Sequence, residues 1–396
     1  MSSQNLALAP RDRASLAVAG VFIAKSARTF CYGFLGILLP LYLAQLGLNA
    51  RGVGIAVTCT LVGSAALTWA VRRPAERLGG RTALVGLAVL SGVAALLLLT
   101  TSNPWLVVLA AMLGNVAVGT GETGPFLSVE QVVIARAAAG ARRTTLLSVY
   151  NLLGYAAAAV GAVVVGLGTA RVLFAVFLVA AFIQIAAYFL LPPAPVAKPI
   201  ATATPGPSTR LIHKLAALFA LDSFAGGFVL QSLIVYYLHA RFGLALETLG
   251  EIFLVAQILT AASLLLAARA ARQFGLLNTI VVSHLVSNVF LVAIAFAPTA
   301  AAAVGLLLAR QLLSQMDVPT RQAYVMAVVE DREREAAATT TTLWRTVTQA
   351  ISPAVTGWVM ASVALGAPFV LGGVLKMVYD VLLYATFKDV EPRNLE

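Results

Sequence analysis

Charged side chains are scarce in this sequence. Only 11% of its 396 residues are charged, whereas 60% are hydrophobic and the mean hydropathy is +0.92. A soluble domain averages about 25% charged residues, so this composition excludes a chain that folds in water. Cysteine is scarce as well. Cys31 and Cys59 both fall within apolar runs, which argues against a disulfide framework.

Motifs for catalysis are missing too. The sequence has no HExxH, no G-x-S-x-G and no Walker phosphate loop, so we expect no enzyme activity, no cofactor, no metal site and no ATP-driven pump. The stretch GTGETGPF (119–126) does match G-x-G-x-x-G. However, a dinucleotide loop follows a strand of a soluble βαβ unit, and the residues before this one fit a membrane helix. We interpret it as a loosened membrane helix that presents Glu122.

Apolar runs of about 20 residues recur along the whole chain, and each is long enough to cross a ~30 Å hydrocarbon core as a helix. We predict twelve spans: 16–43, 53–71, 82–101, 105–126, 146–167, 172–191, 215–238, 248–268, 278–297, 300–318, 338–362 and 367–387. The first run is too long for a signal peptide and lacks a small-residue cleavage site. The predicted fold class is an all-α polytopic protein embedded in a lipid bilayer.

The chain is basic, with 27 Lys and Arg residues and a net charge of +11. If the N-terminus is cytoplasmic, nineteen of them lie in cytoplasmic segments, three on the opposite side (Arg51, Arg171 and Arg241) and five inside spans. This is the positive-inside pattern of membrane proteins. We therefore expect an inner-membrane protein with both termini in the cytoplasm, and no nucleic-acid partner.

A proline-rich segment divides the chain near its middle. Residues 192–209 hold six of the 16 prolines and indicate a linker. At a shift of 196 residues, 24–48 aligns with 220–244, with the apolar spans and basic loops in register. Two equivalent six-helix halves are an architecture of secondary transporters, although hydrophobic helices can also align by chance. We predict an N-terminal bundle, a cytoplasmic linker and a C-terminal bundle at residues 1–191, 192–210 and 211–396.

The loop between the second and third predicted spans reads RRPAERLGGR. Together with the twelve spans and the central linker, it resembles the major facilitator superfamily over essentially the whole chain. That family's loop reads roughly G-x-x-x-D-R-x-G-R-[KR]. Here Glu76 takes the acidic position and Arg77 and Gly79 follow, while Arg72 replaces the leading glycine. The resemblance implies two halves that rock around a central site, with Glu76, Arg77 and Gly79 in a conformational role. An ordinary solvated loop would also fit these residues.

Ionisable side chains inside the first and seventh spans are candidates for the site, because each costs about 2.5–3.5 kcal/mol on insertion scales. Lys25, Arg28 and Tyr32 are spaced by three and four residues, which puts them on one face of a helix. The 196-residue shift brings Asp222 to the same depth, so we expect it to pair with Lys25 or Arg28. Tyr236 is expected on the same face as Asp222. A pair that only satisfies buried charges is the alternative.

A polar stripe is predicted along the tenth span, where Arg310, Ser314, Asp317 and Arg321 are spaced by four, three and four residues. A proline two positions after Asp317 removes a backbone donor and weakens the helix. A shift of 195 residues brings Glu122 onto Asp317, and a proline follows Glu122 as well. Each half therefore has an acid at a weakened point of a helix.

Other polar positions carry less information. The same shift places Asn115 on the first arginine of the stripe. Arg345 of the eleventh span either faces the cavity or pairs with an acid of another helix. Lys376 and Asp380 are four residues apart in the twelfth span and are expected to pair. His284 is alone in the ninth span, without the neighbours of a metal site.

The resemblance implies a secondary active transporter that works by alternating access. We expect a monomer that moves a small organic solute, and the cations in the spans favour an anionic, zwitterionic or amphipathic one. The candidate proton-coupling residues are Asp222, Glu122 and Asp317. The candidate substrate-binding residues are Lys25, Arg28, Tyr32, Asn115, Tyr236, Arg310 and Arg345.

The direction of transport is predicted to be proton-coupled export, because the compact loops resemble those of the family's drug and metabolite exporters. The fifth span, LLGYAAAAVGAVVVG, lacks the Gly-Pro motif usual in those antiporters. Two alternatives therefore stay open. One is an importer or facilitator of an organic anion, and the other is a non-transporting or lipid-handling membrane protein with the same fold.

Overall fold

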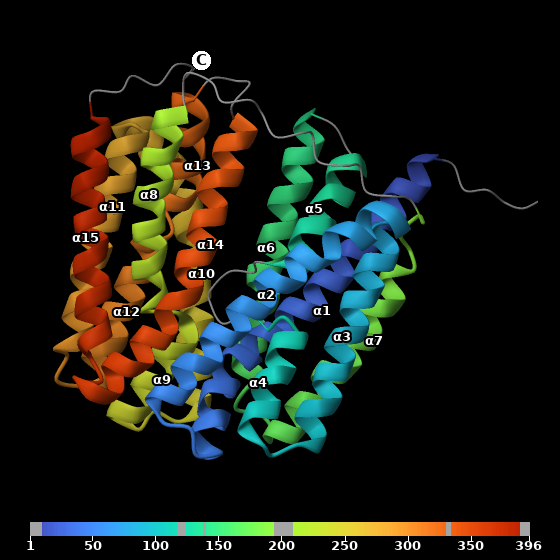
Figure 1. Ribbon diagram of the computed structural model, residues 1–396, viewed down its shortest axis with the longest axis horizontal. Helices are drawn as coiled ribbons and strands as arrows, with labels where there is room; N and C mark the ends of the chain where they lie inside the picture. The colour runs from blue at the N-terminus through green and yellow to red at the C-terminus, as the bar shows by residue number, and fades with distance from the viewer. Residues whose placement is uncertain (1–9, 117–123, 138–139, 194–208, 330–333, 389–396) are drawn as a thin grey trace, which may run out of the picture. The chain divides into compact units, whose positions relative to one another are not determined.

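The computed structural model of the chain describes residues 10–116, 124–137, 140–193, 209–329 and 334–388. The regular structure in these ranges is entirely α-helical (Figure 1). Nine apolar helical stretches in the described ranges are long enough to cross a membrane, and two further apolar helices, α4 and α12, are shorter. The predicted all-α membrane fold is confirmed, while the count of twelve spans stays a prediction.

The chain forms two compact units. Unit 1 comprises Met1–Leu35, Val62–Ala117 and Gly121–Pro199, and unit 2 comprises Gly36–Leu61, Val118–Thr120 and Ile200–Glu396. The division at residues 191 and 211 that the linker suggests stays a prediction.

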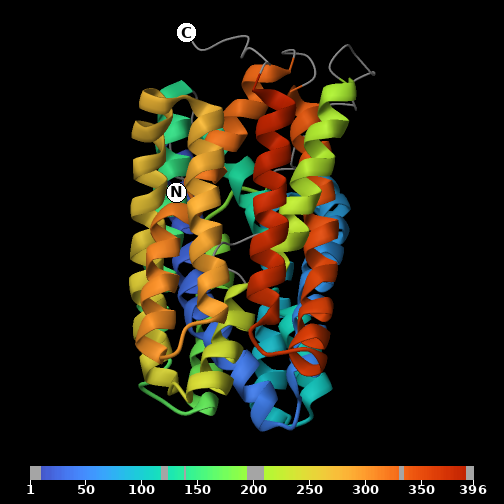
Figure 2. The same ribbon diagram turned by 90° about the vertical axis from the view of Figure 1, so that its left-hand side faces the viewer.

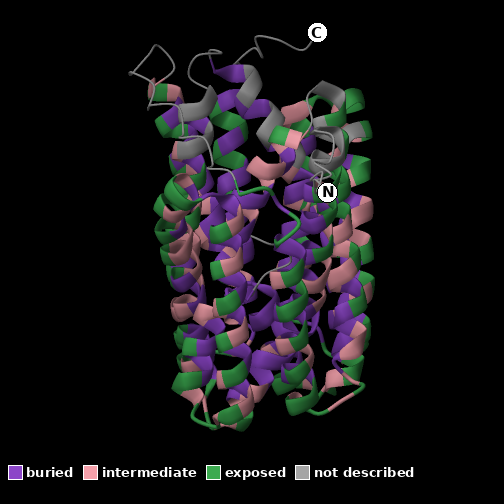
Figure 3. Cartoon of the chain, turned by 90° about the vertical axis from the view of Figure 1, so that its right-hand side faces the viewer, coloured by how far each residue is buried: buried purple, intermediate pink, exposed green. Residues whose placement is uncertain are grey.

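Unit 1 is built from seven helices, two of which extend into unit 2. They are α1 (Pro10–Gln45), α2 (Ala50–Leu78), α3 (Gly80–Thr100), α4 (Pro104–Leu113), α5 (Pro125–Ala137), α6 (Gly140–Val164) and α7 (Ala170–Tyr188). Helix α3 packs along α7 and also contacts α4 and α5. Many large hydrophobic residues of these helices are exposed. Exposed residues face outwards and buried residues lie between the helices (Figure 3).

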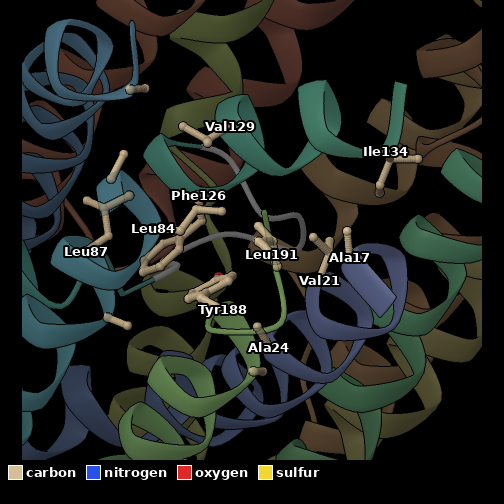
Figure 4. Packing of buried hydrophobic residues seen from close by; sticks show 14 of the residues in the cluster. Ala17, Val21, Ala24, Leu84, Leu87, Phe126, Val129, Ile134, Tyr188 and Leu191 are labelled. Atoms are coloured by element: carbon tan, nitrogen blue, oxygen red, sulfur yellow. The ribbon is translucent and has the colours of Figure 1, made fainter. Parts of the chain in front are cut away.

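The core of unit 1 joins six helices, α1, α2, α3, α5, α6 and α7. Val21 of α1, Leu84 of α3, Phe126 of α5 and Tyr188 of α7 are all buried and belong to one cluster (Figure 4). Helices α1 and α6 approach closely, because a Cβ on Gly161 would collide with the backbone carbonyl of residue 30. This contact fixes the depth of α1 against α6.

Unit 2 contains the remaining helices. They are α8 (Thr209–Gly227), α9 (Gln231–Phe242), α10 (Leu246–Phe274), α11 (Leu276–Ala295), α12 (Ala300–Ser314), α13 (Asp317–Val328), α14 (Arg334–Ser362) and α15 (Ala367–Phe387). Helix α8 packs against α14 and α15, and α11 packs against α15 and α12 (Figure 2). Residues 36–61 join this unit at α14, where the Ala354 amide donates to Thr58 Oγ1 at 2.9 Å.

Three of the predicted spans are interrupted. The fourth leaves the helix after Leu113, and the tenth is broken between α12 and α13. The predicted weakening is confirmed for the tenth span. In the fourth the backbone is no longer helical at residues 114–116, while Glu122, Gly119 and Gly121 lie outside the described residues. The seventh span is also broken, between α8 and α9. Tyr236 and Asp222 stand on opposite sides of this break, so helical periodicity alone does not place them on one face, and that expectation stays a prediction.

Single-residue turns at two glycines support the predicted repeat. Gly79 joins α2 to α3 with φ 95° and ψ 156°, and Gly275 joins α10 to α11 with φ 82° and ψ 162°. The two positions are 196 residues apart, which is the shift predicted from the sequence. This region of backbone conformation is essentially restricted to glycine.

Candidate functional site

A buried ion pair joins α1 to α5 in unit 1. Arg28 Nη1 donates to Glu130 Oε1 at 3.1 Å, and Nη2 donates to Oε2 at 2.7 Å. Neither side chain has any exposed surface. The paired, parallel geometry is the strong form of an arginine–carboxylate contact.

Two tyrosines complete the coordination of Glu130. The Tyr188 hydroxyl of α7 donates to Oε1 at 2.6 Å, and the Tyr150 hydroxyl of α6 donates to Oε2 at 2.6 Å. Arg28 Nη1 also donates to the Tyr188 hydroxyl at 2.8 Å, and its guanidinium lies 4.3 Å from the Phe126 ring centroid. Each carboxylate oxygen therefore accepts two hydrogen bonds. The cluster ties four helices together.

The neighbouring polar residues of α1 point into the same unit. Lys25 Nζ lies 4.2 Å from the centroid of the Tyr150 ring, and its stem lies against Gly154 of α6. The Tyr32 hydroxyl donates to the carbonyl oxygen of Gly114 at 3.4 Å. Tyr32 therefore contacts the point at which α4 ends. Asn115, the next residue, is buried with a positive φ of 49°.

A second network of buried charges lies in unit 2 around Asp222 of α8. Lys376 Nζ of α15 donates to Asp222 Oδ1 at 2.6 Å. Arg321 Nη1 of α13 donates to Asp222 Oδ2 at 3.1 Å and lies 2.7 Å from Asp317 Oδ2. All four side chains are buried. One carboxylate thus holds cations from two other helices.

His284 of α11 extends this network. Its Nδ1 lies 2.7 Å from Asp380 Oδ1, and the Asn288 amide donates to Asp380 Oδ2 at 3.1 Å. Its Nε2 lies 3.4 Å from Lys376 Nζ and 3.6 Å from Asp222 Oδ1. A titratable imidazole therefore stands between two carboxylates and an ammonium.

The other expected site residues surround these networks less closely. Arg345 Nε donates to Ser223 Oγ at 3.0 Å, and Arg310 Nη1 donates to Gln311 Oε1 at 3.1 Å. Neither arginine has an ion pair with a carboxylate in the described part of the chain. Tyr236 is half-buried on α9.

Several expected pairings are corrected by these contacts. Asp222 was expected to pair with Lys25 or Arg28, but each of these cations has partners within unit 1. Lys376 was expected to bind Asp380, yet it donates to Asp222 while Asp380 contacts His284. These pairs form because helix rotation, and not spacing along one helix, decides which opposite charge is nearest.

Two buried charged residues, Arg321 and Glu130, lie outside the predicted spans. Arg321, although part of the predicted polar stripe, is counted among the nineteen cytoplasmic Lys and Arg residues because the tenth predicted span ends at residue 318. Glu130 lies beyond the end of the fourth predicted span at residue 126. In the structure α13 and α5 continue well beyond these points. The apolar run FLSVEQVVIA after the break was the available signal for Glu130. His284 has no charged neighbour close in the sequence, because its charged partners Asp222, Lys376 and Asp380 lie 62 to 96 residues away along the chain.

The expected conformational loop lies at the turn between α2 and α3. Glu76 is half-buried near the end of α2, and Arg77 is exposed beside it. Gly79 is buried in the turn itself. Their role in conformational change stays a prediction.

Known proteins with similar sequence and structure cover nearly the whole chain. The uncharacterized membrane protein YJR124C of Saccharomyces cerevisiae is 23% identical over 415 residues, covering 92% of this chain and 93% of that protein. The D323A mutant of the nucleoside transporter NupG has a TM-score of 0.74 at 14% identity, with 94% of this chain and 100% of that chain covered. The unmodified NupG has a TM-score of 0.73 at 14% identity, with 94% of this chain and 99% of that chain covered.

Two other solved structures share the fold. The D-xylose-proton symporter has a TM-score of 0.71 at 14% identity and covers 96% of this chain and 98% of its own. The human organic anion transporter MFSD10 has a TM-score of 0.66 at 14% identity, with 95% of this chain and 100% of that chain covered. At these identities the likeness establishes the fold alone. The sequence pattern described as Major Facilitator Superfamily matches residues 21–314. The chain therefore belongs to the major facilitator superfamily.

Proposed function

We propose that this protein is a proton-coupled secondary transporter that moves a small organic solute with an anionic group across the cytoplasmic membrane by alternating access. The observation that carries the proposal is the Asp222 network of unit 2. It places titratable groups from α8, α11, α13 and α15 in contact inside an apolar bundle. Apolar side chains would stabilise such an interface at a lower desolvation cost, so the network favours a role in binding and proton exchange.

The proposed solute class follows from the cations near this network. Lys376, Arg310 and Arg345 all carry positive charge, and the last two donate to uncharged side chains. An anionic group would give them a charged partner. The fold is shared with a human organic anion transporter, which agrees with this choice. The transporter is proposed to act as a monomer, with both termini cytoplasmic and without catalysis.

Two directions of solute transport are compatible with this proposal. Export by proton antiport is favoured by the resemblance of the compact loops to those of drug and metabolite exporters. Uptake or facilitated passage of an organic anion is the second candidate. The surplus of cations supports it, and the fold is shared with a proton symporter. Reversing an imposed pH gradient across liposomes distinguishes them, because antiport and symport respond to opposite gradients.

The test is solute-dependent proton movement into liposomes that contain the purified protein and a trapped pH dye. Organic acids, amino acids, nucleosides and sugars are added one class at a time. We expect an organic acid or zwitterion to move protons, and we expect Asp222→Asn to lower the rate about tenfold or more, which corresponds to about 1.4 kcal/mol. Glu247→Gln, which changes an exposed acid at the start of α10, is the matched control. Solute flux that does not depend on the pH gradient would contradict proton coupling. A wild-type transport rate in Asp222→Asn would contradict the assignment of the Asp222 network as the site.

A further inference from the structure

One carboxylate oxygen, Asp222 Oδ1, faces two different groups. Lys376 Nζ donates to it at 2.6 Å, His284 Nε2 lies 3.6 Å from it, and these two nitrogens are 3.4 Å apart. An imidazole nitrogen without a proton accepts a hydrogen bond from an ammonium group. A protonated nitrogen instead adds a second positive charge at the same distance, and the repulsion is strong where the dielectric constant is low. The proton on Nε2 therefore decides which group can stay at Asp222.

The partners of the other ring nitrogen define the tautomer of His284. Nδ1 lies 2.7 Å from Asp380 Oδ1 and 3.3 Å from the amide nitrogen of Asn288, which donates to Asp380 Oδ2 at the shorter distance of 3.1 Å. An ionised carboxylate only accepts hydrogen bonds, so Nδ1 carries the proton of the neutral ring and Nε2 is the nitrogen that can gain one. A carboxylate behind an imidazole also stabilises the imidazolium that forms. Asp380 thus orients His284 towards Asp222.

Charged and titratable groups reach His284 from each helix that surrounds it. Helix α8 contributes Asp222, α13 contributes Arg321 and Asp317 through Asp222 Oδ2, and α15 contributes Lys376, Asp380 and the edge-on ring of Tyr379. Beyond these contacts, α12 holds Arg310 and α14 holds Arg345, both bonded to uncharged side chains. The charged residues of α10 lie towards its two ends.

The ion pairs of this network share carboxylates between helices. Three carboxylates, those of Asp222, Asp317 and Asp380, meet two cations, Lys376 and Arg321. Protonation of His284 would add one positive charge beside Lys376 at Asp222 Oδ1. Arg321 would continue to hold Asp222 through Oδ2 while the partner at Oδ1 is exchanged.

We propose that a proton on His284 Nε2 and the Lys376 ammonium compete for Asp222 Oδ1, so that protonation of His284 releases Lys376 to bind the anionic group of the solute. Gly226, one turn after Asp222, leaves space beside the ammonium, because a Cβ there would lie 3.6 Å from Nζ. The part that concerns the solute rests on the proposed function. Since proton and anion bind together in this scheme, they cross the membrane in the same direction, which favours symport over antiport.

Crystal structures of the wild-type protein at about pH 5 and about pH 8.5, on either side of the range in which histidine usually changes charge, test this exchange. The crystals are soaked in bromide, an anion that anomalous scattering locates. At the higher pH we expect Lys376 Nζ to stay on Asp222 with no bromide beside it. At the lower pH we expect His284 Nε2 within hydrogen-bond distance of Asp222 Oδ1, Lys376 turned away, and bromide at its ammonium.

Two variants show whether the change depends on this histidine. In His284→Gln we expect Lys376 to stay on Asp222 at both pH values, whereas His213→Gln, which alters an exposed histidine of α8, should behave like the wild type. Lys376 bound to Asp222 at both pH values in the wild type overturns the exchange. Bromide at Lys376 at both values, or at neither, overturns the anion site. The structures require no transport, so a failure here is distinct from an absence of solute flux in liposomes.

Discussion

Two buried carboxylates in this protein are satisfied in different ways. Glu130 accepts four hydrogen bonds from Arg28, Tyr150 and Tyr188, with two at each oxygen. Asp222 is shared between cations of two helices and has a histidine nearby. A carboxylate whose two oxygens each accept two hydrogen bonds is suited to holding helices together. A carboxylate with competing partners is suited to exchanging one partner for another. We therefore expect the first to act mainly on stability and the second mainly on transport.

Glu130→Gln tests the stabilising role. The change leaves the guanidinium of Arg28 buried without its counter-charge, so we expect a loss of about 3–5 kcal/mol in the free energy of unfolding. Denaturant titration of the purified protein in detergent measures it. Glu247→Gln removes an exposed acid and should stay within about 0.5 kcal/mol. Replacing both Arg28 and Glu130 by methionine should recover much of the loss, because no unpaired charge remains. Equal stability of Glu130→Gln and Glu247→Gln would contradict the role of this pair.

At the scale of elements, the helices are interrupted or joined where the backbone departs from helical geometry. The breaks after α4 and α12 place Asn115 and Asp317 at helix ends, and the turns at Gly79 and Gly275 join long helices through one residue each. The breaks were predictable from proline and glycine in the sequence. The break between α8 and α9 was not, because only two adjacent glycines precede it, and the same pair at Gly372 and Gly373 lies within α15.

Gly275→Ala tests the requirement for a glycine-only conformation. No heavy atom lies within 4 Å of a Cβ built on Gly275. A lower free energy of unfolding in this variant would therefore come from backbone strain and not from a steric clash. We expect the free energy of unfolding to fall by about 1–3 kcal/mol. The matched control is Gly305→Ala in the interior of α12, which is equally open but has no positive φ. It should gain about 0.5–1 kcal/mol, since alanine favours helix. Similar effects of both changes would contradict the strain.

At the scale of the whole molecule, the two units use corresponding helices with opposite charges. The first span of unit 1 contributes a cation, Arg28, to an acid on α5, the second part of the fourth span. In unit 2 the first span contributes an acid, Asp222, to a cation on α13, the second part of the tenth. A repeated scaffold therefore carries two different networks. The repeat explains why both networks lie on corresponding helices. The residue types differ between the two networks, and this is why we assign the two units different roles.

The orientation of the chain in the membrane follows from its positive charges. Cys31 and Cys59 are first replaced by serine, and one cysteine is introduced at Ser102 or at Gln273, both exposed at helix ends. With a cytoplasmic N-terminus, Ser102→Cys should react with a membrane-impermeant maleimide in intact spheroplasts, and Gln273→Cys should react only after permeabilisation. The reverse pattern would invert the proposed topology.

The sequence by itself determined the membrane-embedded all-α fold, the approximate places of the spans, the resemblance to the superfamily and the positions of most buried charges. These follow from hydropathy and from periodicity along one helix. The tertiary structure alone decided which charges meet. The charged partners of Arg28, Asp222 and His284 lie 62 to 154 residues away along the chain. Such contacts depend on how each helix is rotated and where it is broken, and spacing within one helix carries no information about either.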